Sequence, residues 1–430
     1  MERQDVRYIL NDYERFKTQA LNWSQKFQNV VWLDSNKHID NYTRHESILA
    51  VGEYSSLTSN HNGAFEKLKK YQSETNDYIF GYLSYDLKND TENLLSQNSD
   101  NLEFPDLYFF QPEKLLFISP DGVTFKYLKH SKHSVSKDFD EILNSPELIH
   151  KQEANNSDIQ LRISKDSYLK KVKTILDKIH QGALYEATFC QEFYSENTVI
   201  NPLSVYKNLN AISNAPFATY LKNGNKYLLS ASPERYLKKT GQKVISQPIK
   251  GTAPRSSSKK EDAAFKNALR NDPKERAENI MIVDLVRNDL SRISTRGTTK
   301  VEELCGIYSF KQVHQMISTV STETPKELHP VDIIKKTFPM GSMTGAPKIS
   351  AMEIIEKEEE SKRSLFSGSV GYFTPKGDFD LNVVIRSILY NSQKKYVSFS
   401  VGSAITSLAI PEKELEECML KAKAMKEVLI

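Results

Sequence analysis

The stretch KYLLSASPERYLKKTGQKVISQPIKGT (226–252) decides the fold. Its apolar runs are short and are separated by Ser-Pro and Thr-Gly-Gln, which are turn signals. Three consecutive strands are therefore expected at 226–232, 234–240 and 243–249, joined as a β-meander. A meander belongs to an antiparallel sheet rather than to a parallel sheet with crossover helices.

Working outward from this stretch, the same strand chemistry recurs on both sides. Helices are expected at 164–181, from Pro273 to 286 and from Pro411 to the C-terminus. Because helices and strands follow each other without a regular βαβ alternation, we expect an α/β or α+β fold with a large, mainly antiparallel sheet. Runs rich in Val, Tyr, Phe and Leu predict further strands at 30–34, 78–87, 107–118, 367–374, 379–390 and 395–402.

The composition is typical of a globular protein with a sizeable core, since 39% of the 430 residues are hydrophobic and 26% are charged. The net charge of +3 is spread along the chain and does not indicate a nucleic-acid partner. No apolar run is long enough to span a membrane, and MERQDVRYIL (1–10) lacks the pattern of a signal peptide. The polar stretch 129–160 predicts a surface connection or a weakly ordered excursion between an N-terminal region, 1–128, and a C-terminal region, 161–430.

Three scattered cysteines, Cys190, Cys305 and Cys418, have neither metal-ligand spacing nor a disulfide pattern. We expect three ordinary thiols in a cytoplasmic protein, where disulfides are rare. None of them lies in a Gly-x-Cys-x-Gly context, so we expect no cysteine nucleophile for glutamine hydrolysis in this chain.

Two helices carry carboxylates that are candidates for cation binding. Glu278 lies on the apolar stripe of Met281, Ile282 and Leu285, where a charge is costly unless something compensates it. It is either a first-turn carboxylate favoured by the helix dipole or a ligand of a bound cation. On the last helix Glu414, Glu417 and Lys421 share one face, although Glu417 and Lys421 are also spaced for a simple exposed ion pair.

Two loops contain lysines next to glycine or proline. GSMTGAPK (341–348) does not match the phosphate-binding pattern Gly-x4-Gly-Lys-Ser/Thr, although its backbone N–H groups are candidates for contact with an anionic ligand. Lys250 lies between Ile249 and Gly251. A lysine in a turn is usually solvated, whereas an apolar neighbour permits the partly desolvated amine that a lysine nucleophile needs.

Six segments follow one another along the chain: SPER (232–235), PIKGT (248–252), ENIMIVDLVRNDL (278–290), FPMGSMTGAPK (338–348), GYFTPKGDFDLNVVIRS (371–387) and EECMLKAK (416–423). In sequence and in order they resemble the chorismate-utilising enzyme family. The segments GYLSYDL (81–87) and PDLYFF (105–110) extend the resemblance over nearly the whole chain. It implies an anthranilate synthase component I-like fold, with large antiparallel β-sheets packed face to face and helices outside.

Lys250 separates the ammonia-using members of this family. Anthranilate synthases typically have Pro-Ile-Ala-Gly-Thr, whereas aminodeoxychorismate synthases have Pro-Ile-Lys-Gly-Thr, as at 248–252 here. The resemblance therefore implies the subunit that makes 4-amino-4-deoxychorismate, a precursor of p-aminobenzoate and folate, from chorismate and ammonia. The alternatives are an anthranilate synthase component I and a catalytically silent chorismate-binding subunit.

Three positions depart from the family pattern. Water-adding members have a catalytic Lys, and ammonia-using members usually a Gln, where this chain has Glu186, which argues against water addition. The family often has His at the position of Gln315, next to which lies His314. Anthranilate synthases sense tryptophan through a Leu-Leu-Glu-Ser element, for which WLDS (32–35) is the nearest match.

The resemblance also implies how chorismate is bound. Glu278 and Glu417 are the implied ligands of Mg²⁺, which takes few carboxylates and leaves positions for water and a substrate carboxylate. Arg386 is implied to bind the other carboxylate of chorismate through planar two-point geometry. The remaining implied substrate contacts are Thr252, Gly341, Ser342, Gly402, Ser403 and Lys421.

Two further residues carry the implied reaction. Lys250 is the implied nucleophile at ring carbon C2, and Glu234 the general acid for the leaving 4-hydroxyl; ammonia then adds at C4 and expels the lysine. Attack needs a neutral amine, so burial and nearby positive charge, including Mg²⁺, are expected to lower the pKa of Lys250. A separate glutamine amidotransferase subunit is the expected source of ammonia.

Overall fold

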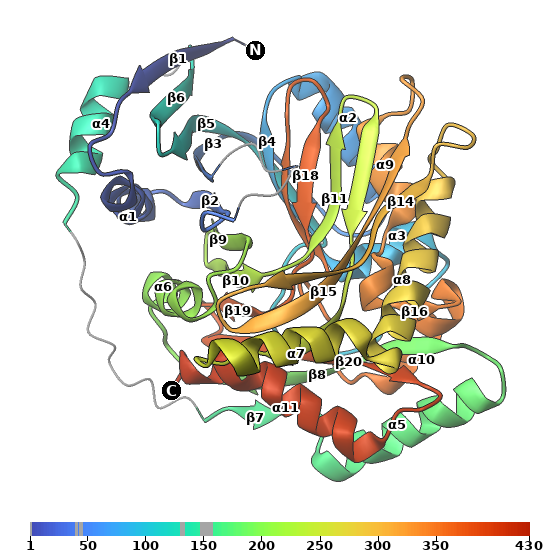
Figure 1. Ribbon diagram of the computed structural model, residues 1–430. Coiled ribbons are helices and arrows are strands. Elements are labelled where there is room, and N and C mark those ends of the chain that lie inside the picture. The colour runs from blue at the N-terminus through green and yellow to red at the C-terminus, as the bar shows by residue number, and fades with distance from the viewer. Residues whose placement is uncertain (1, 39–41, 43–45, 130–133, 147–157) are drawn as a thin grey trace.

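The fold is described from a computed structural model of the chain (Figure 1). The structure describes residues 2–38, 42, 46–129, 134–146 and 158–430. The described residues form one hydrogen-bonded network of 20 strands. Every strand pairing in it is antiparallel, which confirms the fold class expected from the meander.

The network divides into two sheets that share the long strands β3 (Ser47–Ser59) and β5 (Leu107–Ser119), each of which pairs with different neighbours along its length. The first sheet adds β1 (Arg3–Tyr8), β2 (Asn29–Asp34), β6 (Gly122–Leu128), β7 (Gln160–Leu161), β8 (Glu186–Ser195), β9 (Phe217–Asn223), β10 (Lys226–Ser232), β16 (Gly345–Ala346), β19 (Ser387–Asn391) and β20 (Tyr396–Thr406). The second adds β4 (Ile79–Leu83), β11 (Arg235–Thr240), β12 (Lys243–Gln247), β13 (Ile249–Pro254), β14 (Lys300–Ser309), β15 (Val313–Glu323), β17 (Ser369–Phe373) and β18 (Phe379–Asn382).

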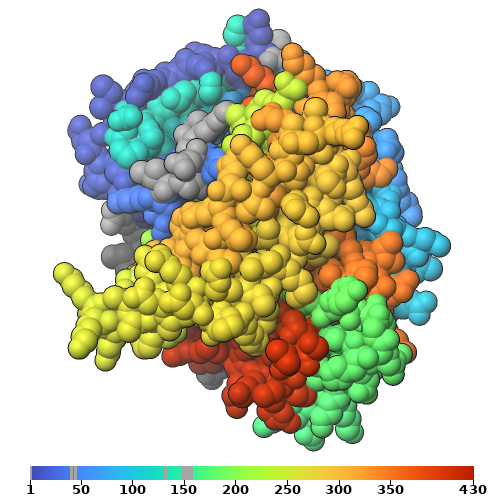
Figure 2. All heavy atoms as spheres, turned by 45° about the vertical axis from the view of Figure 1, so that its right-hand side comes forward, coloured from blue at the N-terminus to red at the C-terminus, as the bar shows by residue number. Residues whose placement is uncertain are grey.

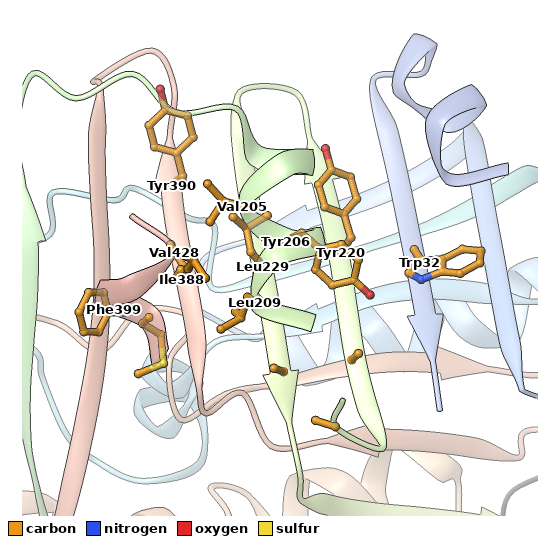
Figure 3. Close-up of a cluster of buried hydrophobic side chains, with 14 of the residues drawn as sticks. Trp32, Val205, Tyr206, Leu209, Tyr220, Leu229, Ile388, Tyr390, Phe399 and Val428 are labelled. Atoms are coloured by element: carbon orange, nitrogen blue, oxygen red, sulfur yellow. The ribbon is translucent and has the colours of Figure 1, made fainter. Parts of the chain in front are cut away.

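Two hydrophobic cores follow from the alternation of side chains along the strands of the first sheet. Leu229 and Ile388 belong to one core, whereas their chain neighbours Leu228 and Leu389 belong to the other. Successive side chains of a strand point to opposite faces, so this sheet is buried on both sides. Figure 3 shows the first core, in which strand residues such as Leu229 and Ile388 meet Leu209 of helix α6. The second core combines residues of both sheets, as expected for sheets packed face to face.

Helices cover the outer faces, as predicted (Figure 1). Helix α7 projects from the surface and buries only Leu269 (Figure 2). The helices are α1 (Tyr13–Trp23), α2 (Ala64–Thr75), α3 (Lys88–Thr91), α4 (Val135–Leu143), α5 (Lys165–His180), α6 (Pro202–Ser213), α7 (Lys259–Asn271), α8 (Pro273–Ser291), α9 (Pro330–Thr337), α10 (Lys348–Glu358) and α11 (Pro411–Glu427), with 3-10 turns at Ser24–Lys26, Tyr85–Leu87 and Gly341–Met343.

The meander is confirmed, but its strands do not stay in one sheet. Strand β10 pairs within the first sheet, and β11 and β12 within the second, so the chain changes sheets at Pro233. The single strand expected at 379–390 is wrong for the same reason: it breaks between β18 and β19. The two crossing points are tied together, because Val383 donates its N–H to the Glu234 carbonyl at 3.0 Å.

The N-terminal region contributes strands to both sheets, since β2 pairs with β9 and β4 with β17. Of the polar stretch 129–160, helix α4 and β7 are described, whereas 130–133 and 147–157 lie outside the described residues. The division at 128 and 161 stays a prediction. Within the described part of the chain, no helix has the length and apolar character needed to cross a membrane.

Candidate active site

The Pro-Ile-Lys-Gly-Thr segment forms a bulge at the start of β13. Its register against β15 shifts between Ile249 and Thr252, so the segment holds one more residue than its partner strand. Gly251 adopts a φ of +99°, and a Cβ there would lie 3.1 Å from Glu275 Oε2 and 3.1 Å from Met316 Cβ. Only glycine meets both demands without strain, so the bulge that carries Lys250 depends on Gly251.

Lys250 is held by a carboxylate that is distant in sequence. Its ammonium donates to Glu186 Oε1 at 2.8 Å, and the two side chains are 12% and 1% exposed. Burial lowers the pKa of Lys250, but attraction by Glu186, with smaller contributions from Glu278 and Glu234, outweighs burial and raises this pKa. The expectation of a lowered pKa is therefore wrong for the chain by itself, and the reason is Glu186.

Asn279 fixes the backbone beneath Lys250. Its side-chain amide donates to the carbonyls of Lys250 and Met316, both at 3.1 Å, and its oxygen accepts a hydrogen bond from Ser318. Asn279 is fully buried in the middle of α8, a position where an amide is costly without partners. The sequence interpretation missed this residue, although a polar side chain among buried positions of α8 was a usable signal.

Glu234 is a buried carboxyl group placed beside Lys250. Burial raises the pKa of Glu234 to about 7, although hydrogen bonds from Ser342 and the Ile249 backbone and the charge of Lys250 act in the opposite direction. A carboxyl group with a pKa near neutrality is half protonated at physiological pH and can donate a proton to a leaving group. The structure thus brings the predicted residues Glu234, Lys250 and Ser342 together.

Ser342 and Gly341 belong to the 3-10 turn Gly341–Met343, which packs against α8. A Cβ at Gly341 would lie 2.8 Å from Leu285 Cδ2, so the turn approaches the helix closely. Lys348, at the end of this loop, donates to Asp289 at 2.6 Å and to two backbone carbonyls. Its three donors are thereby engaged within the protein, which agrees with the absence of a phosphate-loop pattern.

Glu278 lies beyond the first turn of α8, whose acidic first-turn residue is Glu275, so the helix-dipole explanation for Glu278 is wrong. Burial raises the pKa of Glu278 to about 7, while Lys250 and Lys274 lower it. The Lys274 ammonium lies 3.7 Å from Glu278 Oε1. The charge of Glu417 on α11 also acts on Lys274, so both predicted metal ligands lie within electrostatic range of this lysine.

This pair of carboxylates fits Mg²⁺. Within the described ranges, no group of three or more His, Cys, Asp or Glu side chains is arranged to hold a metal ion. Mg²⁺ is usually bound through only one or two carboxylates, with water and substrate oxygens as the other ligands. A cation beside Glu278 would also offset the burial that raises the pKa of this residue. The assignment of Glu278 and Glu417 as ligands stays a prediction.

Arg386 stands at the break between β18 and β19 with a φ of +53°, an uncommon conformation for a residue other than glycine. Burial lowers the pKa of its guanidinium, and Glu417 partly offsets this effect. Among the described residues, no hydrogen bond or ion pair involves the guanidinium. A partly buried guanidinium without a protein partner is suited to receive a carboxylate from a ligand.

The other predicted substrate contacts have different placements. Lys421 donates to the Gly402 carbonyl at 2.8 Å and pairs with Glu417 at 2.6 Å, so the ion pair predicted from spacing is confirmed. Burial raises the pKa of Glu417, but Lys421 outweighs burial and lowers it. The Ser403 hydroxyl donates to Glu414 and is thus occupied within the protein. Thr252 is exposed on β13 and makes no side-chain hydrogen bond among the described residues.

The remaining departures from the family pattern lie on β15 and at the end of β2 in the first sheet. His314 bonds to Ser309 and to Asp262 on α7, so it does not take the place of a histidine at position 315. Gln315 Oε1 is buried without a hydrogen-bond partner in the described part of the chain. Residues 33–35 of WLDS line a cavity of about 80 Å³ between the sheets. Tryptophan binding there stays untested.

Comparison with known proteins assigns the family. A family model described as chorismate binding enzyme matches residues 14–427. The chain belongs to the chorismate binding enzyme family. It is 32% identical to aminodeoxychorismate synthase component 1 of Escherichia coli over 78% of this chain and 73% of that protein. It is 33% identical to anthranilate synthase component 1 of Thermus thermophilus over 81% of this chain and 76% of that protein.

Other members of the family differ in length. The chain is 39% identical to a probable aminodeoxychorismate synthase of rice (Oryza sativa) over 62% of its own length. The matched segment covers only 30% of the rice protein, which is much longer. The solved structure of anthranilate synthase component I from Streptococcus pneumoniae matches with a TM-score of 0.77 and 25% identity, over 90% of this chain and 93% of that one. This match confirms the anthranilate synthase component I-like fold.

The three cysteines of this family member are all buried. Burial raises the pKa of the Cys190 and Cys305 thiols, and that of Cys418 to about 11. A thiol is nucleophilic only as a thiolate, so none of the three is suited to attack glutamine. This supports the expectation from the sequence.

Proposed function

We propose that this chorismate binding enzyme is the synthase subunit of an aminodeoxychorismate synthase, which converts chorismate and ammonia into 4-amino-4-deoxychorismate. The observation that carries the proposal is the buried Lys250 amine, presented on a glycine-dependent bulge beside the protonatable Glu234. The names of the relatives in E. coli and rice support it. The enzyme is accordingly proposed to be a transferase that supplies p-aminobenzoate and folate synthesis.

Substrate binding is proposed to use the charged groups around Lys250. Arg386, which has no protein partner among the described residues, would bind one carboxylate of chorismate in two-point fashion. Glu278 and Glu417 would hold Mg²⁺, which when bound neutralises the other carboxylate and draws electron density from the ring. Ser342 keeps the Glu234 carboxyl group in place through its hydrogen bond.

In the proposed reaction the Lys250 amine attacks C2 of the ring as the 4-hydroxyl leaves, and Glu234 donates the proton that converts this hydroxyl to water. Ammonia then attacks C4 and expels the lysine. Dividing one difficult displacement into two easier steps is the general benefit of covalent catalysis. A lysine nitrogen at C2 also directs ammonia to C4 rather than to C2.

Ammonia is proposed to come from a separate glutamine amidotransferase subunit, because all three thiols of this chain are buried and poorly ionised. We also propose a cytoplasmic location. The relative in E. coli is named component 1, which agrees with a multi-component enzyme. The purified chain should therefore use ammonium salts but not glutamine, and addition of an amidotransferase subunit should make glutamine a substrate. Turnover with glutamine by the purified chain alone would contradict this assignment.

Two alternatives are kept. An anthranilate synthase component I is favoured by the 33% identity to the Thermus thermophilus protein but is disfavoured by Lys250. A catalytically silent chorismate-binding subunit is disfavoured because Glu234, Lys250 and Glu278 gather at one place.

One experiment separates all three. The chain is incubated with chorismate, Mg²⁺ and an ammonium salt, and the product is identified by mass and chromatography. We expect 4-amino-4-deoxychorismate, with neither anthranilate nor isochorismate. Anthranilate as the main product would establish the first alternative, and Mg²⁺-independent binding of chorismate without turnover would establish the second.

A further inference from the structure

No role has so far been assigned to Glu186, yet its carboxylate accepts the hydrogen bond of the Lys250 ammonium. It is 1% exposed and stands at the first position of β8, where its backbone pairs with Ala346 of β16 and Thr406 of β20. Strands on both sides therefore hold the backbone of Glu186 in place beside Lys250.

The Lys250 amine faces four carboxylates, but only one is within contact distance. Glu186 Oε1 is 2.8 Å from the amine nitrogen. Glu234 acts on Lys250 through space from the connection between β10 and β11, and Glu278 and Glu417 do so from α8 and α11. A proton passes directly between groups at hydrogen-bond distance, and among the described residues Glu186 is the carboxylate that lies at this distance from the amine.

We propose that Glu186 positions Lys250 and is its proton acceptor: it takes a proton from the ammonium when the amine attacks chorismate and returns it when the lysine leaves. This inference rests on the proposed function and deepens it. It also gives a reason for a carboxylate at a position where ammonia-using relatives usually have glutamine, which offers no base.

The proton balance of the proposed cycle closes. Glu186 takes one proton from the Lys250 ammonium, and the freed electron pair forms the N–C2 bond. Both ring double bonds shift, the C4–O bond breaks, and the hydroxyl leaves as water with the proton of Glu234. Ammonia then forms the C4–N bond, both double bonds shift back, and the C2–N electron pair returns to lysine. Glu186 restores the proton to Lys250, and Glu234 takes one from the new ammonium group at C4.

The first half-reaction can be observed alone by leaving out ammonia. The intact chain, with saturating Mg²⁺ and chorismate, should gain the mass of chorismate less one water, and peptide mapping should place the adduct on Lys250. Its rate is measured between about pH 5 and 6, where Glu234, with a pKa of about 7, is mostly protonated. In the unmodified enzyme we expect little change over this window, because the proton moves within the Lys250–Glu186 pair.

In Glu186→Gln the proton must go to solvent, so adduct formation should rise about tenfold per pH unit and be about a hundredfold slower at pH 6, within the range of positioned proton transfer. Glu186→Asp keeps a carboxylate and should keep the flat profile at a lower rate. The matched control is Glu192→Gln, a buried carboxylate of the same strand that bonds to Arg162 away from the site; its profile should equal that of the unmodified enzyme.

Parallel pH profiles for the unmodified enzyme and Glu186→Gln would overturn the proposal. Faster adduct formation in Glu186→Gln at every pH would do so too, since Glu186 would then only hold the amine in its charged form. Failure of the proposed function looks different: the unmodified enzyme would form neither the Lys250 adduct nor aminodeoxychorismate. If Glu186→Gln does not fold, the Glu186→Asp profile decides, because a slope of tenfold per unit in that variant contradicts a carboxylate acceptor.

Discussion

Lys114 in the N-terminal region and Lys250 in the candidate site are both largely buried, but the surrounding groups compensate their positive charges in different ways. Lys114 on β5 is 3% exposed and meets one carboxylate, Asp138 of α4, at 2.5 Å. Tyr127 donates to the same carboxylate, and aromatic rings surround the ammonium at 5.4–5.5 Å. The charge of the ammonium is therefore compensated by one carboxylate and by the surrounding aromatic rings, all of which belong to the protein.

Around Lys250 the charges do not close in this way. One amine faces Glu186, Glu234 and Glu278, and burial raises the pKa of the last two to about 7. The Arg386 guanidinium, on which the charge of Glu417 acts, has no hydrogen-bond or ion-pair partner among the described residues. Buried carboxylates that hold protons near neutrality and a guanidinium without a partner are what a site needs in order to receive a dicarboxylate, a cation and a proton transfer. The difference distinguishes a structural ion pair from the charge cluster of a candidate site.

The largest effect should come from exchanging alanine for each lysine. Lys250→Ala removes the nucleophile and should lower aminodeoxychorismate formation by on the order of 10³-fold or more, and any remaining product should carry nitrogen at C2. Lys114→Ala should lower the free energy of unfolding by about 3–5 kcal/mol, because it leaves Asp138 buried and unpaired, but keep kcat per folded molecule. Initial rates with ammonium salts and urea unfolding curves measure both. Equal losses of activity in the two folded variants would contradict the contrast.

A pair of arginines sharpens the comparison next. Arg386→Met should raise KM for chorismate by on the order of 10²-fold, since loss of one partner of a buried charge pair costs about 2–5 kcal/mol. Its stability should change little, because no protein carboxylate loses a contact. Arg235→Met is the matched control: Arg235 is 1% exposed and bonds to Asp380 at 3.0 Å, so this variant should be destabilised by about 3–5 kcal/mol. A strongly destabilised Arg386→Met would show that the guanidinium has a structural partner.

The contrast between the two lysines also shows what could be predicted from sequence. The strands at 226–249, the helix at 164–181 and the start of α8 at Pro273 follow from local patterns, and they are confirmed. The family motifs located Glu234, Lys250, Glu278 and Ser342, which the structure brings together. Local periodicity reports burial and therefore gave no sign that the chain changes sheets at 383–386.

Contacts between residues that are distant in sequence were the other limit. Glu186 and Lys250 are 64 residues apart in sequence. They meet because β8 of the first sheet and β13 of the second sheet come together in the folded chain. The pKa of Lys250 was therefore predicted in the wrong direction. Ser403 is a similar case, since its hydroxyl bonds to Glu414 on α11, which no pattern near 403 indicates.

The third prediction concerns the metal. Glu278→Gln and Glu417→Gln should each lower turnover and raise the Mg²⁺ concentration for half-maximal activity by at least about 10–100-fold, the range found even for residues that only support a metal ligand. The exposed Glu412 in the first turn of α11 provides the control variant Glu412→Gln, which should behave normally. Circular dichroism should show an intact fold in all three. A normal Mg²⁺ requirement in both site variants would exclude these residues as ligands.

The smallest effect is a change in stability with a defined sign, measured without Mg²⁺ or chorismate. The pKa of Glu234 is raised by burial from 4.5 to about 7. Below pH 4.5 the group is protonated in both the folded and the unfolded state and costs nothing. As the pH rises from 4.5 through 7, the unfolded chain releases this proton first, so the free energy of unfolding falls by about 3 kcal/mol and then levels off.

Glu234→Gln cannot ionise and should therefore be more stable than the unmodified enzyme by about this amount at pH 8, and equally stable at pH 4.5. Glu192→Gln removes the carboxylate that Arg162 contacts and should instead be less stable at pH 8, since it breaks an ion pair that is satisfied. Urea midpoints of the three proteins at both pH values test the difference. A destabilised Glu234→Gln at pH 8 would mean that Glu234 is a settled structural carboxylate like Asp138, not a proton donor held ready beside Lys250.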